Sequence, residues 1–343
     1  MTMMMAARFY APGDVRYEPV PLNPPGPGEL VVEVKTALTC GTDLKAYRRG
    51  HPVLLKNFPA LFGHEGAGIV TAVGEGVHRF KPGDRVVAAN SAPCDACFFC
   101  LKGQPNLCES LDLLNGAYAQ YLTIPARIAE KNTLQIPPHV PFEKAAFCEP
   151  LAVCLRGIEA CNIQPGDTVC VIGTGTVGQF MIRLATLKGA TVVALGRNAM
   201  KRQLAQTFGH ADHVLEMTPE LSIETIRSGH GFDVVIEAVG QPATWALALN
   251  LVRKGGLINW FGGCASGTKV EVDTRRMHYD ELTLISLFHH TPHYFAQALD
   301  LISRDVLDPT PLISDHQPMS QVVEALKQVE AGKAVKVALS PEL

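Results

Sequence analysis

The chain has 343 residues, of which 47% are hydrophobic, and its formal net charge at pH 7 is −3. This length and composition predict a soluble globular protein of two domains with an ample core. No run of basic residues exceeds two, so the sequence lacks the charge pattern of proteins that bind nucleic acids or anionic membranes.

The sequence also has no recognisable targeting or membrane-spanning segment. The N-terminal MTMMMAARFYAPG has neither a charged n-region nor a long apolar stretch, and no apolar run reaches the roughly 18 residues that span a bilayer. Ten cysteines in such a chain indicate a reducing compartment, where thiolates bind metals rather than form disulfides. We therefore expect a cytoplasmic protein.

The first 140 residues are predicted to be rich in β-strands, and two short motifs there carry candidate metal ligands. Cys40 follows the β-type run LVVEVKTALT and should lie where a strand opens into a loop. His64 and Glu65 precede another expected strand, among glycines that let the backbone approach closely. A catalytic zinc ion needs about three protein ligands and one open position. Taken singly, such a cysteine is more often a small buried residue and such a His-Glu pair a surface feature.

A second type of metal site is predicted from the run CDACFFCLKGQPNLC. Its cysteines, with spacing Cys-x2-Cys-x2-Cys-x7-Cys, are Cys94, Cys97, Cys100 and Cys108. Four thiolates close a tetrahedral zinc site and leave no position for substrate, so we predict a structural zinc lobe at about residues 91–113. The alternatives are four unrelated buried cysteines or a nucleic-acid-binding ribbon, and the weakly charged flanks disfavour the ribbon.

A dinucleotide-binding unit is predicted after the helix-like stretch PFEKAAFCEPLAVCLRGIEA and a Gln-Pro-Gly-Asp turn. An apolar strand at 169–172 runs into Gly173-Thr-Gly175-x-x-Gly178, followed by a helix and a second strand at 191–195. The first glycine makes a tight turn, the second admits the pyrophosphate, and the third lets helix and strand pack closely. The helix N-terminus supplies amide donors for the phosphates.

The alternation continues through the helix AMKRQLAQTFG, the strand FDVVIEAVG, the helix QPATWALALNLVRKGG and the strand LINWFGG. This pattern predicts an α/β fold with a doubly wound parallel sheet at about residues 152–288. The tail, about 289–343, is expected to add two helices and the strand AVKVALS and to fold back onto the N-terminal domain.

The string Gly-His-Glu-x2-Gly-x5-Gly-x2-Val, from Gly63 to Val77, resembles the zinc-dependent medium-chain dehydrogenases, and with the motifs above the resemblance covers essentially the whole chain. It is similar to the polyol branch, which includes sorbitol, threonine and glucose dehydrogenases. The resemblance implies a chaperonin-10-like β-barrel catalytic domain at 1–151 and 289–343, and a Rossmann domain at 152–288. It also implies two zinc ions per subunit and a homo-oligomer, either a dimer or a tetramer.

Carried over by position, Cys40 and His64 match the catalytic zinc ligands of this family. Glu65 matches a glutamate that ligates in sorbitol-type members, and Glu149, in Cys-Glu-Pro-Leu, matches the later ligand position. Whether Glu65, Glu149 or water completes the coordination sphere stays open.

The neighbours of these ligands suggest a proton path. Zinc would act as a Lewis acid on an alcohol oxygen, and Thr42, two residues after Cys40, is placed to remove the proton. The alternative is that Thr42 is an ordinary loop threonine that caps a turn and takes no part in proton transfer. Asp43 is expected to orient a ring nitrogen of His64. Many relatives have histidine where Lys45 stands, so either Lys45 or water would pass the proton to solvent.

The end of the second Rossmann strand bears on the cofactor. NAD enzymes usually place an acid there for the ribose 2′-hydroxyl, whereas this strand ends Leu-Gly196-Arg197-Asn198. Arg197 can bind a 2′-phosphate, with help from Lys201 or Arg202, so we favour NADP over NAD. The alternative is that Arg197 is a solvated surface residue. The residues expected to contact the cofactor are Gly173, Gly175, Thr176, Val177, Gly178, Gly196, Arg197, Asn198, Lys201 and Val239.

Residues expected near the substrate by family position are polar or aromatic: Lys45, Tyr47, Arg48, Phe288, His289 and His290. Sorbitol-type enzymes have arginine where His289 stands, which argues against sorbitol itself but still suits a polyol, sugar or amino alcohol. Two other functions stay open. A zinc-free quinone or enone reductase of the same fold would differ in metal content, and a catalytically silent dinucleotide-binding protein would show no turnover of polyols.

Overall fold

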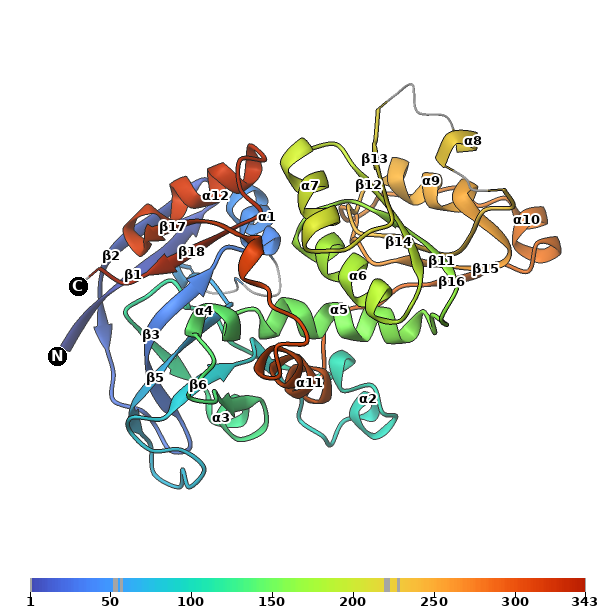
Figure 1. Ribbon diagram of the computed structural model, residues 1–343. Coiled ribbons are helices and arrows are strands. Elements are labelled where there is room, and N and C mark those ends of the chain that lie inside the picture. The colour runs from blue at the N-terminus through green and yellow to red at the C-terminus, as the bar shows by residue number, and fades with distance from the viewer. Residues whose placement is uncertain (1, 52–54, 56–57, 219–222, 227–228, 343) are drawn as a thin grey trace. The chain divides into compact units, whose positions relative to one another are not determined.

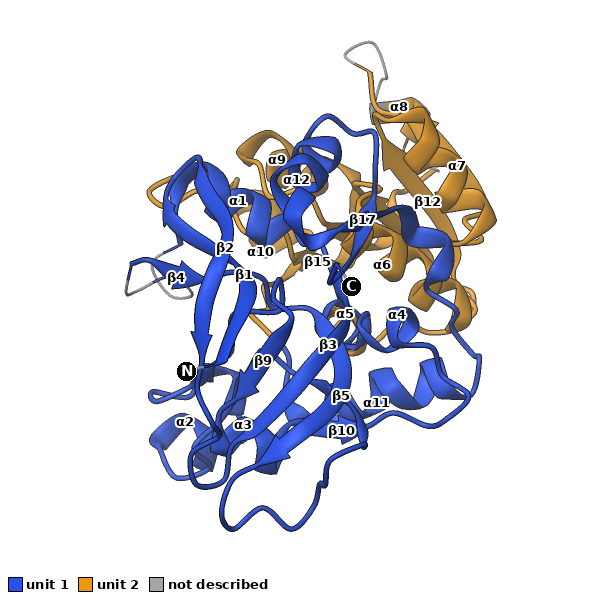
Figure 2. Ribbon diagram, turned by 90° about the vertical axis from the view of Figure 1, so that its left-hand side faces the viewer, with its two compact units in different colours: residues 1–152, 290–343 blue, residues 153–289 orange. Residues whose placement is uncertain are grey.

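The computed structural model describes residues 2–51, 55, 58–218, 223–226 and 229–342, and the chain divides into two compact units (Figures 1 and 2). Unit 1 comprises residues 1–152 and 290–343, and unit 2 comprises residues 153–289. Within the described chain the longest helix, α5, has 13 residues, and no helix combines the length and apolar character needed to cross a bilayer.

Unit 1 consists mainly of strands joined by short helices. Its elements before the division are β1 (Thr2–Ala11), β2 (Asp14–Leu22), β3 (Leu30–Leu38), α1 (Gly41–Arg49), β4 (Ala60–Leu61), β5 (Gly66–Val73), β6 (Arg85–Ala88), β7 (Ser91–Ala92), α2 (Phe98–Leu101), η1 (Pro105–Leu107), β8 (Asp112–Leu113), β9 (Tyr121–Ile124), α3 (Ala126–Lys131), β10 (Thr133–Gln135), α4 (Phe142–Ala145) and the start of α5 (Cys148–Ala160). The C-terminal segment adds α11 (Pro292–Ser303), η2 (Thr310–Leu312), β17 (Ile313–Pro318), η3 (Met319–Gln321), α12 (Val322–Glu330) and β18 (Lys336–Ser340).

Strand β3 is the central strand of unit 1. It pairs with β5 and β9, and its last residues pair antiparallel with β18, so the sheet runs β10-β6-β5-β3-β18-β17 with β9 also on β3. A smaller sheet has the order β2-β1-β4. The C-terminal strand therefore lies beside the end of β3, where the segment that carries Cys40 begins (Figure 1).

Unit 2 is an α/β unit built on one six-stranded sheet. Its elements are the rest of α5, then β11 (Thr168–Ile172), α6 (Thr176–Leu187), β12 (Thr191–Gly196), α7 (Ala199–Thr207), β13 (His213–Glu216), α8 (Ile223–Ile226), β14 (Phe232–Glu237), α9 (Pro242–Leu251), β15 (Val252–Trp260), α10 (Thr274–Tyr279) and β16 (Thr283–Ile285). All strand pairs are parallel, in the order β13-β12-β11-β14-β15-β16. The order reverses direction between β11 and β14, which is the switch point of a doubly wound sheet. The predicted α/β class is therefore confirmed.

The central strands of this sheet are apolar because both of their faces are covered. In β11 and β12 every residue after the first is buried, as expected for parallel strands that read as continuous apolar runs.

Two Pro-Gly-Asp turns each lead directly into a strand. Gly83 before β6 and Gly166 before β11 have φ of 94° and 91°, a left-handed conformation that glycine adopts without strain.

Some predicted elements differ from the observed ones. The helix expected at 241–256 ends at Leu251, because the chain continues as β15, which shifts register against β14 and has Gly255 at φ 68°. The loop expected after Cys40 is the helix α1. Strands β13, β16 and β17 were not predicted: β13 and β16 have only 4 and 3 residues, and β17, with the sequence ISDHQP, is mostly polar.

Candidate functional site

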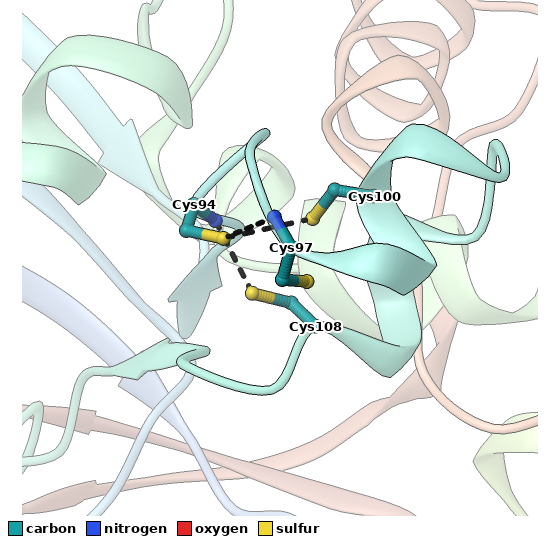
Figure 3. Close-up of side chains that lie close together, drawn as sticks. All are labelled: Cys94, Cys97, Cys100 and Cys108. Carbon is teal, nitrogen blue, oxygen red and sulfur yellow. Dashed lines mark hydrogen bonds between the residues drawn. The ribbon is translucent and has the colours of Figure 1, made fainter.

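The four cysteines of the predicted structural zinc site lie together, with their sulfur atoms turned toward one another (Figure 3). All four sulfurs lie within 4.8 Å of one another, and the Sγ atoms of Cys94 and Cys100 are 4.0 Å apart. A tetrahedron with Zn–S bonds of about 2.3 Å has sulfur–sulfur edges of about 3.8 Å. The arrangement therefore fits a zinc ion in both donor type and spacing.

Local chain geometry explains why this spacing works. Cys97 caps the short helix α2, so that Cys100 lies one turn later, and Gly103, with φ 76°, reverses the chain toward Cys108. Backbone amides point at the sulfurs: the amide of Cys97 donates to Cys94 Sγ at 3.3 Å, and that of Cys94 donates to Cys108 Sγ at 3.2 Å. Hydrogen bonds from the Ala96 amide, the Ser110 hydroxyl and the Cys97 amide lower the pKa of Cys94 to about 6, which favours the thiolate that binds metals.

A second cluster gathers three of the predicted catalytic zinc ligands. One ligand atom from each of Cys40, His64 and Glu65 lies within 4.8 Å of the others. Cys40 is the N-cap of α1, and its sulfur accepts a hydrogen bond from the Thr42 amide at 3.4 Å. His64 and Glu65 lie just before β5, and because β5 pairs with β3, the two motifs meet at one end of this strand pair.

The predicted contact of Asp43 with His64 is present. Asp43 Oδ1 lies 2.9 Å from His64 Nδ1, and the Tyr118 hydroxyl donates a hydrogen bond to Asp43 Oδ2. This leaves the other ring nitrogen of His64 available as a ligand. The glycine at 63 is needed because a Cβ there would lie 2.6 Å from the Tyr118 ring, and its φ is 90°. Burial lowers the pKa of His64, but Asp43 and Cys40 raise it more, to well above its ordinary value.

Lys336 is a buried partner of this cluster that sequence reasoning missed. Its ammonium group forms an ion pair with Glu65 and donates to the backbone oxygen of Thr39 at 2.8 Å. Lys336 is the first residue of β18, which the pairing of β18 with β3 brings to this end of the sheet. The available signal was a lysine inside the apolar run AVKVALS, where a charge is retained only with a partner.

The buried side chains around Cys40 suit a bound zinc ion. Asp43, Glu65 and Glu149 are each buried, whereas Lys336 is the only buried lysine or arginine among the described residues. The Oε1 atom of Glu65 is buried and accepts no hydrogen bond from the described residues, which leaves it available to bind a metal ion. Thiolate, imidazole and carboxylate are the donors that zinc prefers. The residues present therefore fit a zinc ion, which would displace the protons of its ligands on binding.

Glu149, at the start of α5, belongs to a separate hydrogen-bonded group. Its Oε1 accepts a hydrogen bond from Asn90 Nδ2 at 3.0 Å, and Asn90 Oδ1 lies 2.9 Å from His290 Nε2. Burial raises the pKa of Glu149 to about 7, with His64 opposing the rise and Glu65 adding to it. Sequence reasoning named His290 but not Asn90, which carried no motif signal.

Four other residues predicted near this site, Thr42, Lys45, Tyr47 and Arg48, lie on α1. Thr42 is half-buried at the second position of the helix, and Lys45 and Arg48 are exposed. Arg48 forms an ion pair with Glu330 of α12, and Tyr47 packs against the hydrophobic core of unit 1. The structure thus places Thr42 beside Cys40, whereas Arg48 is directed to α12.

In unit 2, the predicted cofactor residues lie at the carboxyl ends of the adjacent strands β11, β12 and β14. Gly173 turns the chain with φ 106°, and Gly175 caps α6 with open space at the position of a Cβ. A Cβ on Gly178 would lie 1.9 Å from the Gly173 oxygen. Each glycine therefore has the geometry expected of its place in a pyrophosphate-binding loop, with Thr176 and Val177 starting the helix.

The residues expected at the ribose follow β12. Arg197 is exposed, Asn198 caps α7 by accepting from the Lys201 amide at 3.0 Å, and burial lowers the pKa of Lys201. Arg202, named as a possible helper, instead donates to the Arg197 carbonyl at 2.7 Å and to Glu216 at 2.7 Å.

Three further predicted positions, Val239, Phe288 and His289, also lie in unit 2. Val239 follows β14, and its side chain lies against Gly173. Phe288 is exposed and stacks on His289 with ring centroids 5.4 Å apart, and Arg156 donates to both of their carbonyl groups.

Comparison with known proteins matches both parts of the chain. Residues 26–137 match the family model described as the alcohol dehydrogenase GroES-like domain, and residues 176–304 match the zinc-binding dehydrogenase model. The erythritol/L-threitol dehydrogenase of Mycolicibacterium smegmatis is 33% identical, with 98% of each chain covered. The sorbitol dehydrogenase of Bacillus subtilis is 28% identical over 95% of this chain and 93% of the relative.

A solved structure of similar fold is named as a zinc-binding dehydrogenase of Sinorhizobium meliloti bound to NADP. It is 30% identical, with a TM-score of 0.92, and the match covers 99% of this chain and 100% of that one.

The Glu65–Lys336 pair leads to a prediction about stability. Lys336→Met should lower the free energy of unfolding by about 3–5 kcal/mol, because it leaves the Glu65 carboxylate buried without its partner. Adding Glu65→Gln should recover part of the loss, as coupling between the two sites requires. Denaturant unfolding followed by circular dichroism measures both, with the exposed Lys333→Met as the control. An equal loss in the control variant would contradict the assignment.

Proposed function

Because the chain belongs to the zinc-dependent medium-chain dehydrogenases, in their polyol branch, we propose that it oxidises a secondary alcohol of a polyol, sugar or amino alcohol with NAD(P). The predicted family and its NAD(P)-dependent alcohol oxidoreduction are confirmed by the matches to both domain models and to named polyol dehydrogenases. The observation that carries the proposal is the convergence of Cys40, His64 and Glu65, with Asp43 behind His64.

In the proposed site, Cys40, His64 and Glu65 hold the catalytic zinc ion. Bound there, zinc supplies Lewis-acid chemistry that lowers the pKa of a substrate alcohol. Asp43 holds the tautomer and orientation of the His64 ring. The Thr42 hydroxyl accepts the alcohol proton at its oxygen and releases its own proton, which Lys45 or water passes to solvent. Lys336 pairs with Glu65, and Asn90 donates a hydrogen bond to Glu149, which is the alternative carboxylate ligand.

We propose NADP as the preferred cofactor. Strand β12 ends without an acid, Arg197 is exposed beside its end, and Lys201 is a partly desolvated ammonium that an anion would stabilise. The similar Sinorhizobium meliloti structure, described as bound to NADP, supports this choice. We further propose a homo-oligomer, a dimer or a tetramer, in the cytoplasm, where the zinc-ligand thiols stay reduced.

The direct test of the function is a panel of polyols, sugars and amino alcohols assayed with NAD and NADP side by side. The proposal expects turnover of at least one secondary alcohol, and loss of that turnover in Cys40→Ser with the four-cysteine site still loaded. Turnover of quinones or enones by metal-free protein would instead favour the zinc-free reductase, and no turnover would favour a silent dinucleotide-binding protein.

Two zinc ions per subunit are expected on elemental analysis of the purified protein. Cys97→Ser should remove the slowly exchanging ion and lower thermal stability, because a structural zinc contributes directly to folding. Cys264→Ser, which lies outside both clusters, is the matched control and should keep both ions. Folded, active wild-type protein without zinc would refute both site assignments.

The proposed proton path predicts a kinetic effect at Thr42. Thr42→Val should lower kcat for alcohol oxidation by roughly 10²-fold, because the proton-accepting oxygen is lost, while zinc content and cofactor affinity stay as in wild type. Thr42→Ser keeps the hydroxyl and should retain most of the rate. If Thr42→Val turns over like wild type, Thr42 has no part in proton transfer.

The cofactor proposal predicts a selective loss at Arg197. Arg197→Ala should weaken NADP by roughly 10- to 150-fold and leave NAD nearly unchanged, since a charge-assisted contact to phosphate contributes about 1.5–3 kcal/mol. Arg275→Ala, an exposed arginine on α10, is the control. The measurement is kcat/KM with both cofactors. An equal effect on both, or a wild-type preference for NAD, would refute the NADP assignment.

A further inference from the structure

The end of β12 is closed to any side chain by a residue of the glycine-rich loop. A Cβ built on Gly196 would lie 2.3 Å from the Oγ1 atom of Thr174, 2.8 Å from its Cγ2 atom and 3.1 Å from its Cβ atom. Distances below 3.0 Å between such atoms do not occur in folded proteins, so one of the two residues would have to move. Gly196 and Thr174 are both buried, with Thr174 5% exposed.

Rotation of the Thr174 side chain does not relieve this overlap. Threonine carries two heavy atoms on its Cβ, which occupy two of the three staggered positions. Both occupied positions lie within 3.0 Å of the Gly196 Cβ position, so any other rotamer still leaves a heavy atom in one of them. Only the removal of the branched side chain makes room.

The backbone of Thr174 is also held in place. The buried Gln179 side chain donates from Nε2 to the Thr174 carbonyl at 3.0 Å and to the Lys201 carbonyl at 2.7 Å, which ties the glycine loop to α7. The Gly173 amide donates to the Leu195 carbonyl at 2.8 Å, one residue before Gly196. The loop and the strand end are therefore fixed to each other on both sides of the Thr174–Gly196 contact.

We propose that Thr174 is a specificity-determining residue for the cofactor, which acts by excluding every side chain from position 196. An acid that would bind a ribose 2′-hydroxyl cannot stand at the end of β12 while Thr174 is present. The space beside Arg197 is thereby kept for the 2′-phosphate. The predicted effect on cofactor preference rests on the NADP proposal, whereas the steric exclusion of side chains at position 196 does not depend on the cofactor.

A consequence is that cofactor preference is set by two positions that have to change together. Gly196→Asp alone should disturb the loop and weaken both cofactors, because the aspartate side chain displaces the residues that shape the pyrophosphate site. Gly196→Asp together with Thr174→Gly should bind NAD, since the carboxylate then has room to accept from the 2′-hydroxyl and repels a 2′-phosphate.

The steric part is tested on the full chain without added cofactor, by thermal unfolding. Gly196→Ala should lower Tm by roughly 3–10 °C, the range expected for overpacking. Adding Thr174→Gly should abolish that decrement relative to Thr174→Gly alone, whereas adding Thr174→Val should not, because valine keeps both branches without the hydroxyl. A wild-type Tm for Gly196→Ala, or equal rescue by Thr174→Val, would overturn the proposal.

The functional part is tested by direct titration of NADPH and NADH through their fluorescence. Relative to wild type, Gly196→Asp with Thr174→Gly should shift the ratio of the two Kd values toward NADH by roughly 10- to 100-fold. Gly196→Asp with Thr174→Val should not show this gain in NADH binding. If Gly196→Asp alone binds NADH as well as the Thr174→Gly double variant, at wild-type Tm, Thr174 excludes nothing and the proposal fails.

The two proposals fail in different ways. A wild-type protein that binds NADH more tightly than NADPH would refute the NADP preference, whatever the Tm values. The comparison of Gly196→Ala with its two Thr174 double variants would still decide whether Thr174 closes position 196. Should the aspartate variants not fold, the alanine series alone decides it.

Discussion

The buried ion pair between Glu65 and Lys336 is the interaction on which the candidate metal site of unit 1 depends. A carboxylate and an ammonium removed from water are tolerated only as partners, and each also constrains the backbone around it. Lys336 begins β18 and also donates to the Thr39 carbonyl, one residue before Cys40. The pair therefore holds the C-terminal strand, the end of β3 and the His64–Glu65 segment in one arrangement, in which the buried Glu65 Oε1 atom has no hydrogen-bond partner among the described residues.

The four-cysteine lobe, unlike the cluster at Cys40, is assembled from residues close together in the sequence. Its candidate ligands come from one short segment. The helix α2, the left-handed Gly103 and the 3₁₀ helix η1 turn the chain so that the four sulfur atoms face one another. Large apolar residues of this lobe, among them Phe98 and Leu101, are exposed, so metal coordination would supply stabilisation that burial does not. Four sulfurs would complete the coordination sphere of a zinc ion, which distinguishes this site from the three-ligand cluster at Cys40.

Unit 2 shows how close packing and ligand binding use the same residues. The glycines that let α6 approach β11 also leave the loop amides open to a phosphate, and the pattern of buried strands places the loop at the switch point of the sheet. The Gln179 side chain links this loop to α7, so the glycine-rich loop and the segment expected at the ribose form one hydrogen-bonded unit. A residue of the glycine-rich loop, such as Thr174, can thus restrict which side chains, and hence which cofactor, the end of β12 accommodates.

The amino-acid sequence by itself determined the features that depend on a short stretch of chain: the four-cysteine spacing, the glycine motif between an apolar strand and a helix, the Pro-Gly-Asp turns, and through these the α/β class and the family. The helix predicted from the sequence pattern extended too far, because the residues after Leu251 pair with β14 as strand β15. Only the tertiary structure decided the partners of the site residues. Lys336 is 271 positions from Glu65, and His290 is 200 positions from Asn90. Strand pairing and burial bring these residues together, and the sequence around one residue gives no information about its distant partner.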